Sequence, residues 1–587
     1  MSLKKCKTIS DLFRLALDTN PDGDFVRMVK DDEDVQKITY RSANSMINAL
    51  SRFLISKGLK KGDKIAVLGS NYPEWAISYF GVVNFGGIVI PVDKMLPIQE
   101  ILYILRFSDT KCVIGESKYL KDIDEYKEEI PDVELYVSFG IDREHDYITL
   151  NQIFKKEFPN IEIEPPDEDD LASLIFTSGT TGLAKGVQLT HKNFTQDVIY
   201  VRDWIDINKE DCVYLILPMN HVFAFTCGFL GAISGSAAFT CARSFRPNEI
   251  LEDIKLTNVT IFLGVPLLFD KILAGLDKKV GEKGIITRSY VKTSFLASKF
   301  LKNVFNSRGG SKLFKSLRAK AGLDNVRLFV SGGAPASQIT IERYNLMGFK
   351  FIQGYGLTET APVVSLNAKG DYKIGSIGPA LKQIEVKIDN PNVNGVGEIC
   401  VKGDIVMKGY YKNKEATDQV ISKDGWFRTG DLGLIDEEGY IFIKGRSKDV
   451  IVTSGGKNVY PEEIEFMINI SPFIQESLVR GIPDPASSGE VVEAIIVPNY
   501  EVFEEYCQNH KLEFCDSLIK DIIKKEIYKV NEKSPVFKRI KDFQIRQEEF
   551  EKTSTKKVKR YLYKWKPIEI DQVKEKKPKK ENYEKGV

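Results

Sequence analysis

Hydrophobic and polar residues alternate in two rhythms along the first half of the chain. Helical spacing of apolar residues occurs in three segments, 40–57, 73–80 and 97–109. Short apolar runs, typical of buried strands, separate and follow these segments at 64–68, 87–91, 111–114, 212–217, 259–263 and 326–330. Strands that alternate with helices predict parallel βαβ units, and hence an α/β fold of layered sheets and helices.

The pattern changes after about residue 370, where glycines become dense. Two short strand patterns, 432–435 and 440–444, flank the turn sequence DEEG and predict a hairpin. The polar stretch KGRSKD that follows is the best domain boundary. We therefore predict three parts: a large domain over 1–445 whose β-rich, barrel-like subdomain spans 371–445, a small mobile α+β domain over 446–565, and a Lys/Glu-rich disordered tail over 566–587.

Composition narrows the class of protein. Lys and Arg number 83 and Asp and Glu 82, so the formal net charge is +1 and nothing global points to nucleic acid. The eight cysteines contain no C-x-x-C and the four histidines lack ligand spacing, so neither a disulfide framework nor a zinc site is expected. No signal-peptide pattern and no run of about 20 apolar residues occurs. The interpretation is a cytoplasmic protein, with attachment to a membrane surface left open.

One loop has a sequence that indicates a binding site for phosphate groups. Residues 174–187 read LIFTSGTTGLAKGV, an apolar strand that runs into a loop of small and hydroxyl residues with a lysine. Such a loop lets backbone N–H groups approach a polyphosphate closely, although a Ser/Thr-rich surface turn has the same composition. It does not fit the Walker A pattern. The predicted polyphosphate-binding residues are Thr177, Ser178, Gly179, Thr180, Thr181, Gly182 and Lys185.

Further motifs follow in a fixed order along the chain. They read SGGAP at 331–335, QGYGLTET at 353–360, DGWFRTGDLG at 424–433, GRSKDVIVTSGGKNVYPEEIE at 445–465 and EKTSTKKVKR at 551–560. Together with the first loop, they resemble the adenylate-forming superfamily, which includes acyl-CoA synthetases. The resemblance covers residues 8–565.

The resemblance implies a site for ATP and Mg²⁺. The loop at 177–185 would hold the β- and γ-phosphates, Thr358 would touch phosphate, and Glu359 would hold Mg²⁺ together with Thr180. Asp431 would accept the ribose hydroxyls, with Arg446 assisting. Adenine would lie in a cradle formed by Gly332, Gly333, Ala334, Pro335, Gln353, Gly354, Tyr355 and Gly356.

Two residues are expected to act at the carboxylate of the substrate. His221 follows the predicted strand at 213–217. A lone histidine at such a position is more often a packed or capped core residue, but the resemblance implies that His221 shapes the carboxylate site. The family's terminal motif aligns Lys557 with the catalytic lysine. Lys556 stands where the family usually has glycine, so a slip of one residue onto Lys556 stays open.

A second half-reaction is implied by the small domain. Lys448 occupies the family's hinge position, and Gly455, Gly456 and Lys457 would line the path of coenzyme A after the domain rotates. The catalytic residues implied are thus Lys557, Glu359, Thr358 and His221.

The substrate is expected to be a long-chain fatty acid. Between residues 285 and 320 there are nine Lys or Arg and no Asp or Glu, with apolar residues at helical spacing. Such a segment suits an anionic membrane surface, although a helix packed on the large domain fits equally well. Transfer to an acyl carrier protein, another carboxylic acid–CoA ligase and a non-catalytic nucleotide-binding protein stay as alternatives; an amino-acid substrate is disfavoured because residues 212–240 contain no acid. Oligomeric state cannot be read from these patterns.

Overall fold

The chain forms two compact units, which are described separately. The computed structural model describes residues 2–30, 34–140, 147–159, 161–177, 184–282, 285–305, 310–367, 373, 375–484, 489–553 and 557–565. By residue contacts, the large unit comprises Met1–Ser447 with Lys552–Lys557, and the small unit comprises Lys448–Glu551 with Val558–Val587. This division falls two residues after the boundary predicted at 445/446. The tail predicted over 566–587 lies outside the described residues.

The first eight-stranded sheet of the large unit has the order β15-β14-β13-β12-β10-β11-β1-β2. Strands β10 to β14 and β1 pair in parallel, and β15 and β2 are antiparallel edges. The strands are β1 (Asp24–Val29), β2 (Val35–Thr39), β10 (Cys212–Leu215), β11 (Ala238–Cys241), β12 (Ile261–Gly264), β13 (Leu328–Ser331), β14 (Lys350–Gly356) and β15 (Val363–Leu366).

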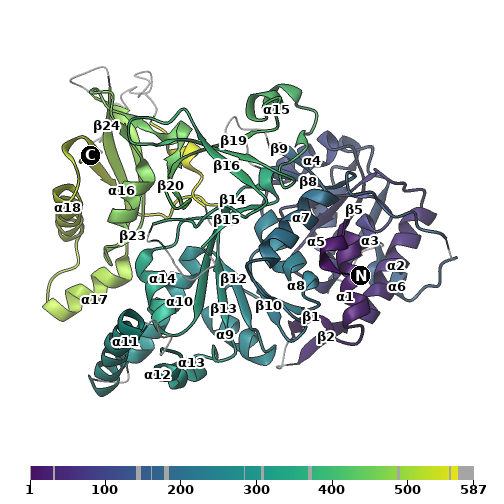
Figure 1. Cartoon of the computed structure of the whole chain (residues 1–587), viewed down its shortest axis with the longest axis horizontal. Coiled ribbons are helices and arrows are strands. Elements are labelled where there is room, and N and C mark those ends of the chain that lie inside the picture. Colours follow the sequence, from purple (N-terminus) through teal and green to yellow (C-terminus); the bar gives the residue numbers. More distant parts are fainter. Residues whose placement is uncertain are drawn as a thin grey trace, which may run out of the picture. The chain divides into compact units, whose positions relative to one another are not determined.

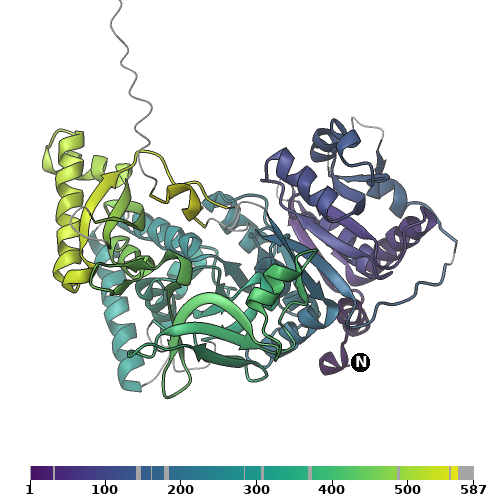
Figure 2. The same cartoon turned by 90° about the horizontal axis from the view of Figure 1, so that it is seen from above.

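The second eight-stranded sheet has the order β18-β9-β8-β4-β3-β5-β6-β7. Its strands are β3 (Lys64–Leu68), β4 (Ile88–Val92), β5 (Thr110–Glu116), β6 (Leu135–Phe139), β7 (Ile148–Thr149), β8 (Leu171–Thr177), β9 (Lys185–Thr190) and β18 (Gly409–Tyr410). Both faces of β3 are buried, because alternate residues pack into two different hydrophobic cores. Most of this sheet belongs to the purple-to-blue elements that gather on one side of the large unit in Figure 2.

Helices cover both sheets of the large unit (Figure 1). α3 is buried along almost its whole length, and it contacts β3 and β4 of one sheet and β1 of the other. A helix that is apolar all round is expected in such a position. The remaining helices are α1 (Ile9–Thr19), α2 (Tyr40–Ser56), α4 (Ile98–Phe107), α5 (Ser117–Asp124), α6 (Leu150–Phe154), α7 (His191–Arg202), α8 (Gly231–Ser234), α9 (Pro247–Leu256), α10 (Pro266–Glu282), α11 (Ile285–Phe305), α12 (Gly310–Leu313), α13 (Lys315–Lys320), α14 (Gln338–Leu346) and α15 (Lys414–Val420), while α3 spans Pro73–Val83.

The helical segments α7 and η4 (Phe223–Leu230) contact each other in the large unit. α7 begins at His191 because Thr190 and Asn193 form a reciprocal capping box, which satisfies backbone N–H groups at the helix start. The segment η4 is a π-helix, a form that often occurs at functional sites. No helix among the described residues is both long and apolar enough to cross a membrane.

A third, four-stranded antiparallel sheet completes the large unit. Its order is β16-β17-β19-β20, formed by β16 (Glu385–Asp389), β17 (Gly397–Lys402), β19 (Phe427–Ile435) and β20 (Ile441–Arg446). The hairpin predicted around DEEG is confirmed as β19 and β20.

The small unit has its own core. A hairpin of β21 (Ile451–Val452) and β22 (Asn458–Val459) accompanies a three-stranded sheet, β23 (Ile474–Pro483), β24 (Glu490–Pro498) and β25 (Ile540–Ile545). Its helices are α16 (Pro461–Ile468), α17 (Tyr500–His510) and α18 (Asp516–Glu532). Isoleucine and valine side chains from α16, α18 and the sheet form the core. The predicted fold class, a large unit of layered αβ sheets with a smaller α+β unit, is confirmed.

Candidate active site

Several predicted site residues that the structure describes, among them His221, Gly332 and Thr358, follow parallel strands of the large unit and line one cavity. Because β10, β12, β13 and β14 run in the same direction, the loops that follow them meet at one edge of the sheet, where α/β proteins bind ligands. The glycines of these loops allow close approach. A Cβ on Gly332 would lie 2.7 Å from the ring of Phe223, and one on Gly356 would lie 1.6 Å from the carbonyl oxygen of Pro362.

A carboxylate, a phenol and a lysine lie together beside β14. Glu359 belongs to the short helix η5 (Thr358–Thr360), and its Oε1 accepts a hydrogen bond of 2.9 Å from the Tyr410 hydroxyl. The ammonium of Lys185 lies 5.0 Å from the centre of the Tyr410 ring. Strand β18 pairs with β9, and this pairing places Tyr410 beside Lys185. The arrangement suits a polyphosphate with a bound cation, because it combines a fixed positive charge with an oriented carboxylate.

A second polar cluster surrounds Asp431. Asp431 and Arg446 are register partners on β19 and β20, and Arg446 Nε lies 2.7 Å from Asp431 Oδ1. The Tyr355 hydroxyl donates to Asp431 Oδ2 at 2.6 Å. Burial raises the pKa of Tyr355, and the neighbouring Asp431 raises it further, so the phenol stays neutral and donates. An ionised carboxylate only accepts hydrogen bonds, so Asp431 is chemically suited to hydroxyl groups of a ligand.

His221 and Lys557 face the same space. His221 Nε2 lies 3.7 Å from Asp93 Oδ2. Burial lowers the pKa of His221, against the opposing effect of Asp93, so the neutral imidazole is favoured near pH 7. Burial also lowers the pKa of Lys557, and Arg446 adds to this effect while Asp431 and Glu359 oppose it. Within its own loop, Lys557 N–H donates to the Thr553 hydroxyl at 3.2 Å.

A cavity of about 180 Å³ leads away from this cluster. Its mouth includes His221, Gly332, Thr358 and Lys557. It continues along the face of β12 and β13 toward their amino ends, and a strand path from Leu328 to Gly332 spans roughly 13 Å. The inner wall is mainly apolar and includes Val198, Val201, Ile207, Ile261, Leu263 and Leu328.

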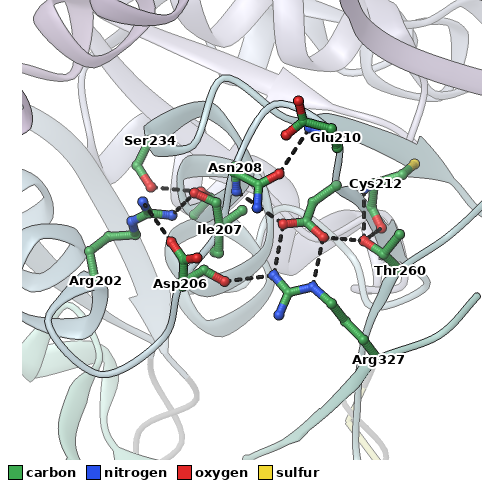
Figure 3. Close-up of polar contacts among 11 residues, drawn as sticks. Arg202, Asp206, Ile207, Asn208, Glu210, Cys212, Ser234, Thr260 and Arg327 are labelled. Carbon is green, nitrogen blue, oxygen red and sulfur yellow. Dashed lines mark hydrogen bonds and ion pairs between the residues drawn. The ribbon is translucent and has the colours of Figure 1, made fainter.

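A polar network connects residues that lie just before the parallel strands β10, β12 and β13 (Figure 3). Arg327, just before β13, binds both oxygens of Asp211 at 2.8 and 2.7 Å. Thr260, just before β12, donates to the same carboxylate at 2.6 Å. Arg202 also lines the cavity, and its guanidinium binds the Ile207 carbonyl and lies 3.8 Å from an Asp206 carboxylate oxygen. Asp211, which directly precedes the acid-free segment 212–240, therefore forms a structural ion pair with Arg327.

The structure locates some predicted residues elsewhere. Lys448 and the turn Gly455, Gly456 and Lys457 belong to the small unit, where the turn connects β21 to β22 and Gly456 has φ +66°. Ser178, Gly179, Thr180, Thr181 and Gly182 lie outside the described residues, as does Lys556. The residues predicted to hold adenine stay with the site: Gly333 and Gly354 line its cavity, Gln353 lies beside them on β14, and Ala334 and Pro335 continue the exposed loop after β13.

Sequence reasoning missed several residues of this site. Tyr410 connects Glu359 with Lys185, Asp93 faces His221, and Asp197 lines the cavity. None of them belongs to a motif used in the sequence argument, and each reaches the site from a different element. Only the folded chain brings them together, so no local pattern could have identified them.

The family model of the AMP-binding enzyme matches residues 13–411. The chain therefore belongs to the AMP-binding enzyme family, as its motifs predicted. It is 30% identical over 500 residues to the long-chain-fatty-acid–CoA ligase of Escherichia coli O6:H1, covering 78% of this chain and 81% of that protein. It is 29% identical over 472 residues to a feruloyl-CoA synthase of Amycolatopsis sp, covering 78% of this chain and 84% of that protein.

Solved structures agree on the fold. An anthranilate CoA ligase in complex with anthranoyl-AMP superposes with a TM-score of 0.77 at 21% identity, covering 95% of this chain and 96% of that one. At this identity the likeness concerns the fold alone.

Proposed function

We propose that this protein activates a carboxylic acid with ATP and transfers the acyl group to coenzyme A, and that the acid is a long-chain fatty acid. The observation that carries the proposal is the cavity, because it joins the polar cluster at the strand ends to a long apolar interior. Such a shape suits an acid with a charged head and an apolar tail. The relatives named as acid–CoA ligases support it.

The proposed chemistry has two steps. A carboxylate oxygen of the acid attacks the α-phosphorus of ATP, the bond from that phosphorus to the bridging oxygen breaks, and pyrophosphate leaves. The sulfur of coenzyme A then attacks the acyl carbon of the adenylate, the bond to the phosphate oxygen breaks with AMP leaving, and the thiol proton passes to solvent. Both steps need positioning and charge stabilisation more than covalent help from the protein.

The residues of the large unit fit distinct roles in the first step. Lys557 would stabilise the negative charge that gathers between carboxylate and α-phosphate, and neutral His221 would border the carboxylate. Thr358 would touch phosphate, and Lys185 would hold the leaving pyrophosphate. Asp431 would accept the ribose hydroxyls beside Arg446, while Gly332–Pro335 and Gln353–Gly356 would flank adenine.

The residues also fit Mg²⁺ bound together with a nucleotide. Mg²⁺ is commonly held by one or two carboxylates plus substrate phosphates, and Glu359 offers one carboxylate that Tyr410 orients. When bound, Mg²⁺ would neutralise phosphate charge. Thr180, the other predicted ligand, remains a proposal.

Replacing Tyr410 with phenylalanine is expected to raise the KM for Mg-ATP about tenfold, because partners that orient a metal ligand typically matter by that amount. The measurement is initial rate against Mg-ATP concentration at saturating acid. Tyr411→Phe is the matched control: the Tyr411 hydroxyl binds Asp109 at 2.8 Å, outside the cluster, so its KM should stay near that of the parent. Equal KM values in the two variants would contradict the role of Tyr410.

For the second step, the small unit would rotate between two orientations, as the family resemblance implies. Lys448 would serve as the hinge, and the turn at Gly455, Gly456 and Lys457 would border the pantetheine arm of coenzyme A. An acyl carrier protein is the competing acceptor.

The test is AMP formation from Mg-ATP with a panel of acids, with and without coenzyme A. AMP that needs both acid and coenzyme A, with stoichiometric thioester, supports the ligase. In a second outcome, pyrophosphate exchanges into ATP only when acid is present, and no thioester forms on coenzyme A. That result would support the adenylation step and show that the acyl acceptor is another thiol. Absence of both reactions across the panel would reject the proposal.

We further propose that α11 contacts an anionic membrane surface, with the protein otherwise cytoplasmic. Phe295 packs on Phe314 at 4.7 Å between ring centres, whereas Tyr290, Leu296 and Phe300 are 60–64% exposed. An exposed apolar face with basic residues and no acids suits such a surface. Replacing Tyr290, Leu296 and Phe300 with glutamine should abolish co-sedimentation with anionic vesicles. The proposal would be contradicted if the fraction of protein that co-sediments were the same with neutral and anionic vesicles and were unchanged by these substitutions.

A further inference from the structure

Three side chains that line the cavity have a buried polar atom without a hydrogen-bond partner among the described residues: Arg202 Nε, Asp197 Oδ2 and Thr226 Oγ1. The last two belong to neutral or neutralisable groups. Asp197 of α7 is 0% exposed and Thr226 of η4 is 1% exposed. Asp197 Oδ1 accepts from the Val363 N–H at 3.0 Å, but Asp197 Oδ2 and Thr226 Oγ1 have no partner among the described residues. Buried polar atoms are nearly always satisfied, and an unsatisfied one costs about 1–3 kcal/mol. These two atoms therefore need a partner that enters the cavity.

The two side chains belong to adjacent helices. The rings of Phe194 on α7 and Phe225 on η4 pack edge to face with centres 5.3 Å apart. Asp197 follows Phe194 by three residues, close to one helical turn, and Thr226 directly follows Phe225. The Asp197 carboxyl also lies within electrostatic range of the Cys227 thiol, the residue after Thr226 on η4.

The environment of Asp197 favours its neutral form. Burial raises the pKa of this carboxyl well above its ordinary value, against one backbone hydrogen bond. A protonated carboxyl with Oδ1 engaged by Val363 can place its O–H on Oδ2. Asp197 and Thr226 then each present a hydroxyl, which can donate or accept.

We infer that the acid recognised by this cavity carries a hydroxyl group on its apolar part, and that Asp197 Oδ2 and Thr226 Oγ1 bind that hydroxyl. This inference rests on the proposed function and specifies its substrate class: a hydroxylated carboxylic acid. A hydroxyl matches two groups of mixed donor and acceptor character. A purely aliphatic chain would leave both polar atoms unsatisfied in a closed apolar wall.

An ammonium group fits this position less well than a hydroxyl. It would require an ionised Asp197, whereas burial favours the neutral carboxyl, and Arg202 already adds a positive charge to the same cavity lining. The guanidinium of Arg202 binds the Ile207 carbonyl (Figure 3).

The experiment compares kcat/KM for a straight-chain acid with its isomers hydroxylated near the carboxylate, at mid-chain and at the terminus. The wild-type protein is assayed for coenzyme A-dependent AMP formation with Mg-ATP. We expect one hydroxylated isomer to exceed the straight-chain acid about tenfold or more, since a site built to bind a hydroxyl discriminates strongly against analogues that lack it. Thr226→Val, which keeps the side-chain shape, should reduce that preference to within about threefold.

Two further variants separate hydrogen bonding from packing. Asp197→Asn retains an acceptor for the Val363 N–H but loses a hydroxyl, so it should also weaken the preference. Val201→Ala, an apolar change in the same wall, should lower kcat/KM for both acids while their ratio stays within about twofold. Thermal unfolding of each variant checks that the fold is retained.

The outcomes distinguish this inference from the proposed function. Activation of straight-chain acids with no preferred hydroxylated isomer would overturn the inference and leave the ligase intact. A preference for the terminal isomer that survives Thr226→Val would overturn it and point to Arg202. Absence of AMP formation and of pyrophosphate exchange with every acid would overturn both.

Discussion

Replacing Lys557 with alanine is expected to lower the rate of adenylate formation about 10²- to 10³-fold, the loss typical of a donor that acts at a transition-state charge. Lys557 lines the cavity beside His221 and Thr358, and the pKa of its ammonium responds to the charges of Arg446, Asp431 and Glu359. Among the described residues, the other basic residues predicted for the ATP site, Lys185 and Arg446, do not line this cavity. The measurement is acid-dependent exchange of labelled pyrophosphate into ATP.

Lys556→Ala is the matched control, because the neighbouring lysine could take the same role if the alignment slipped by one residue. It should keep exchange within about threefold of the parent. Thioester formation from preformed acyl-adenylate, which bypasses the first step, should survive in Lys557→Ala and shows that the protein is folded. Loss of exchange in Lys556→Ala with retention in Lys557→Ala would assign the role to Lys556.

The same lysine predicts a pH dependence. Burial lowers the pKa of Lys557 from its ordinary 10.5, so the ammonium loses its proton at a lower pH than a free lysine does. Adenylation should therefore fall as the pH rises through that pKa. Lys557→Arg, whose guanidinium stays charged, should retain whatever rate it has across the same range.

Replacing Asp431 with alanine is expected to lower kcat/KM for ATP about 100-fold. The change removes the acceptor of the ribose hydroxyls in the proposal, and it leaves the Arg446 guanidinium and the Tyr355 hydroxyl without their acceptor. Hydrogen bonds to a charged group contribute about 1.5–3 kcal/mol each, so losing two gives roughly this factor or more. The measurement is initial rate against ATP concentration, at saturating acid and coenzyme A.

Two controls define the role of Asp431. Asp436 lies in the same hairpin, and its carboxylate forms an ion pair with Lys373 at 2.6 Å. Asp436→Ala should therefore leave kcat/KM for ATP near the parent value. Tyr355→Phe removes only the phenol hydroxyl, and its effect should be smaller than that of Asp431→Ala. An Asp431→Ala protein with unchanged kcat/KM for ATP would contradict the assignment.

The sequence predicted the elements whose burial pattern is strong. The run at 64–68 is observed as β3, and the helical pattern at 40–57 as α2. The run at 212–217 was predicted to be one strand, but β10 ends at Leu215. The reason is a tertiary contact: the Asn71 side chain donates to the carbonyls of Leu215 and Leu217. An apolar run cannot reveal which distant side chain will take its backbone groups.

In the candidate site too, some residues could be predicted from the sequence and others could not. Glu359, Asp431 and Lys185 could be proposed from the sequence because they belong to motifs that resemble those of a known family. Tyr410 and Asp197 were not, because their roles arise from the β9–β18 pairing and from the packing of α7 on η4. The helix α11 was predicted as basic and amphipathic, but only the structure separates its packed Phe295 from its exposed Leu296.

The most direct test of the proposed function is AMP release from Mg-ATP, measured with a long-chain fatty acid or its hydroxylated form, with and without coenzyme A. We predict AMP and thioester in equal amounts, only when acid and coenzyme A are both present. ATP turnover that is independent of added acid, or no AMP with any carboxylic acid tested, would contradict the assignment of this cavity as an acyl-adenylate site.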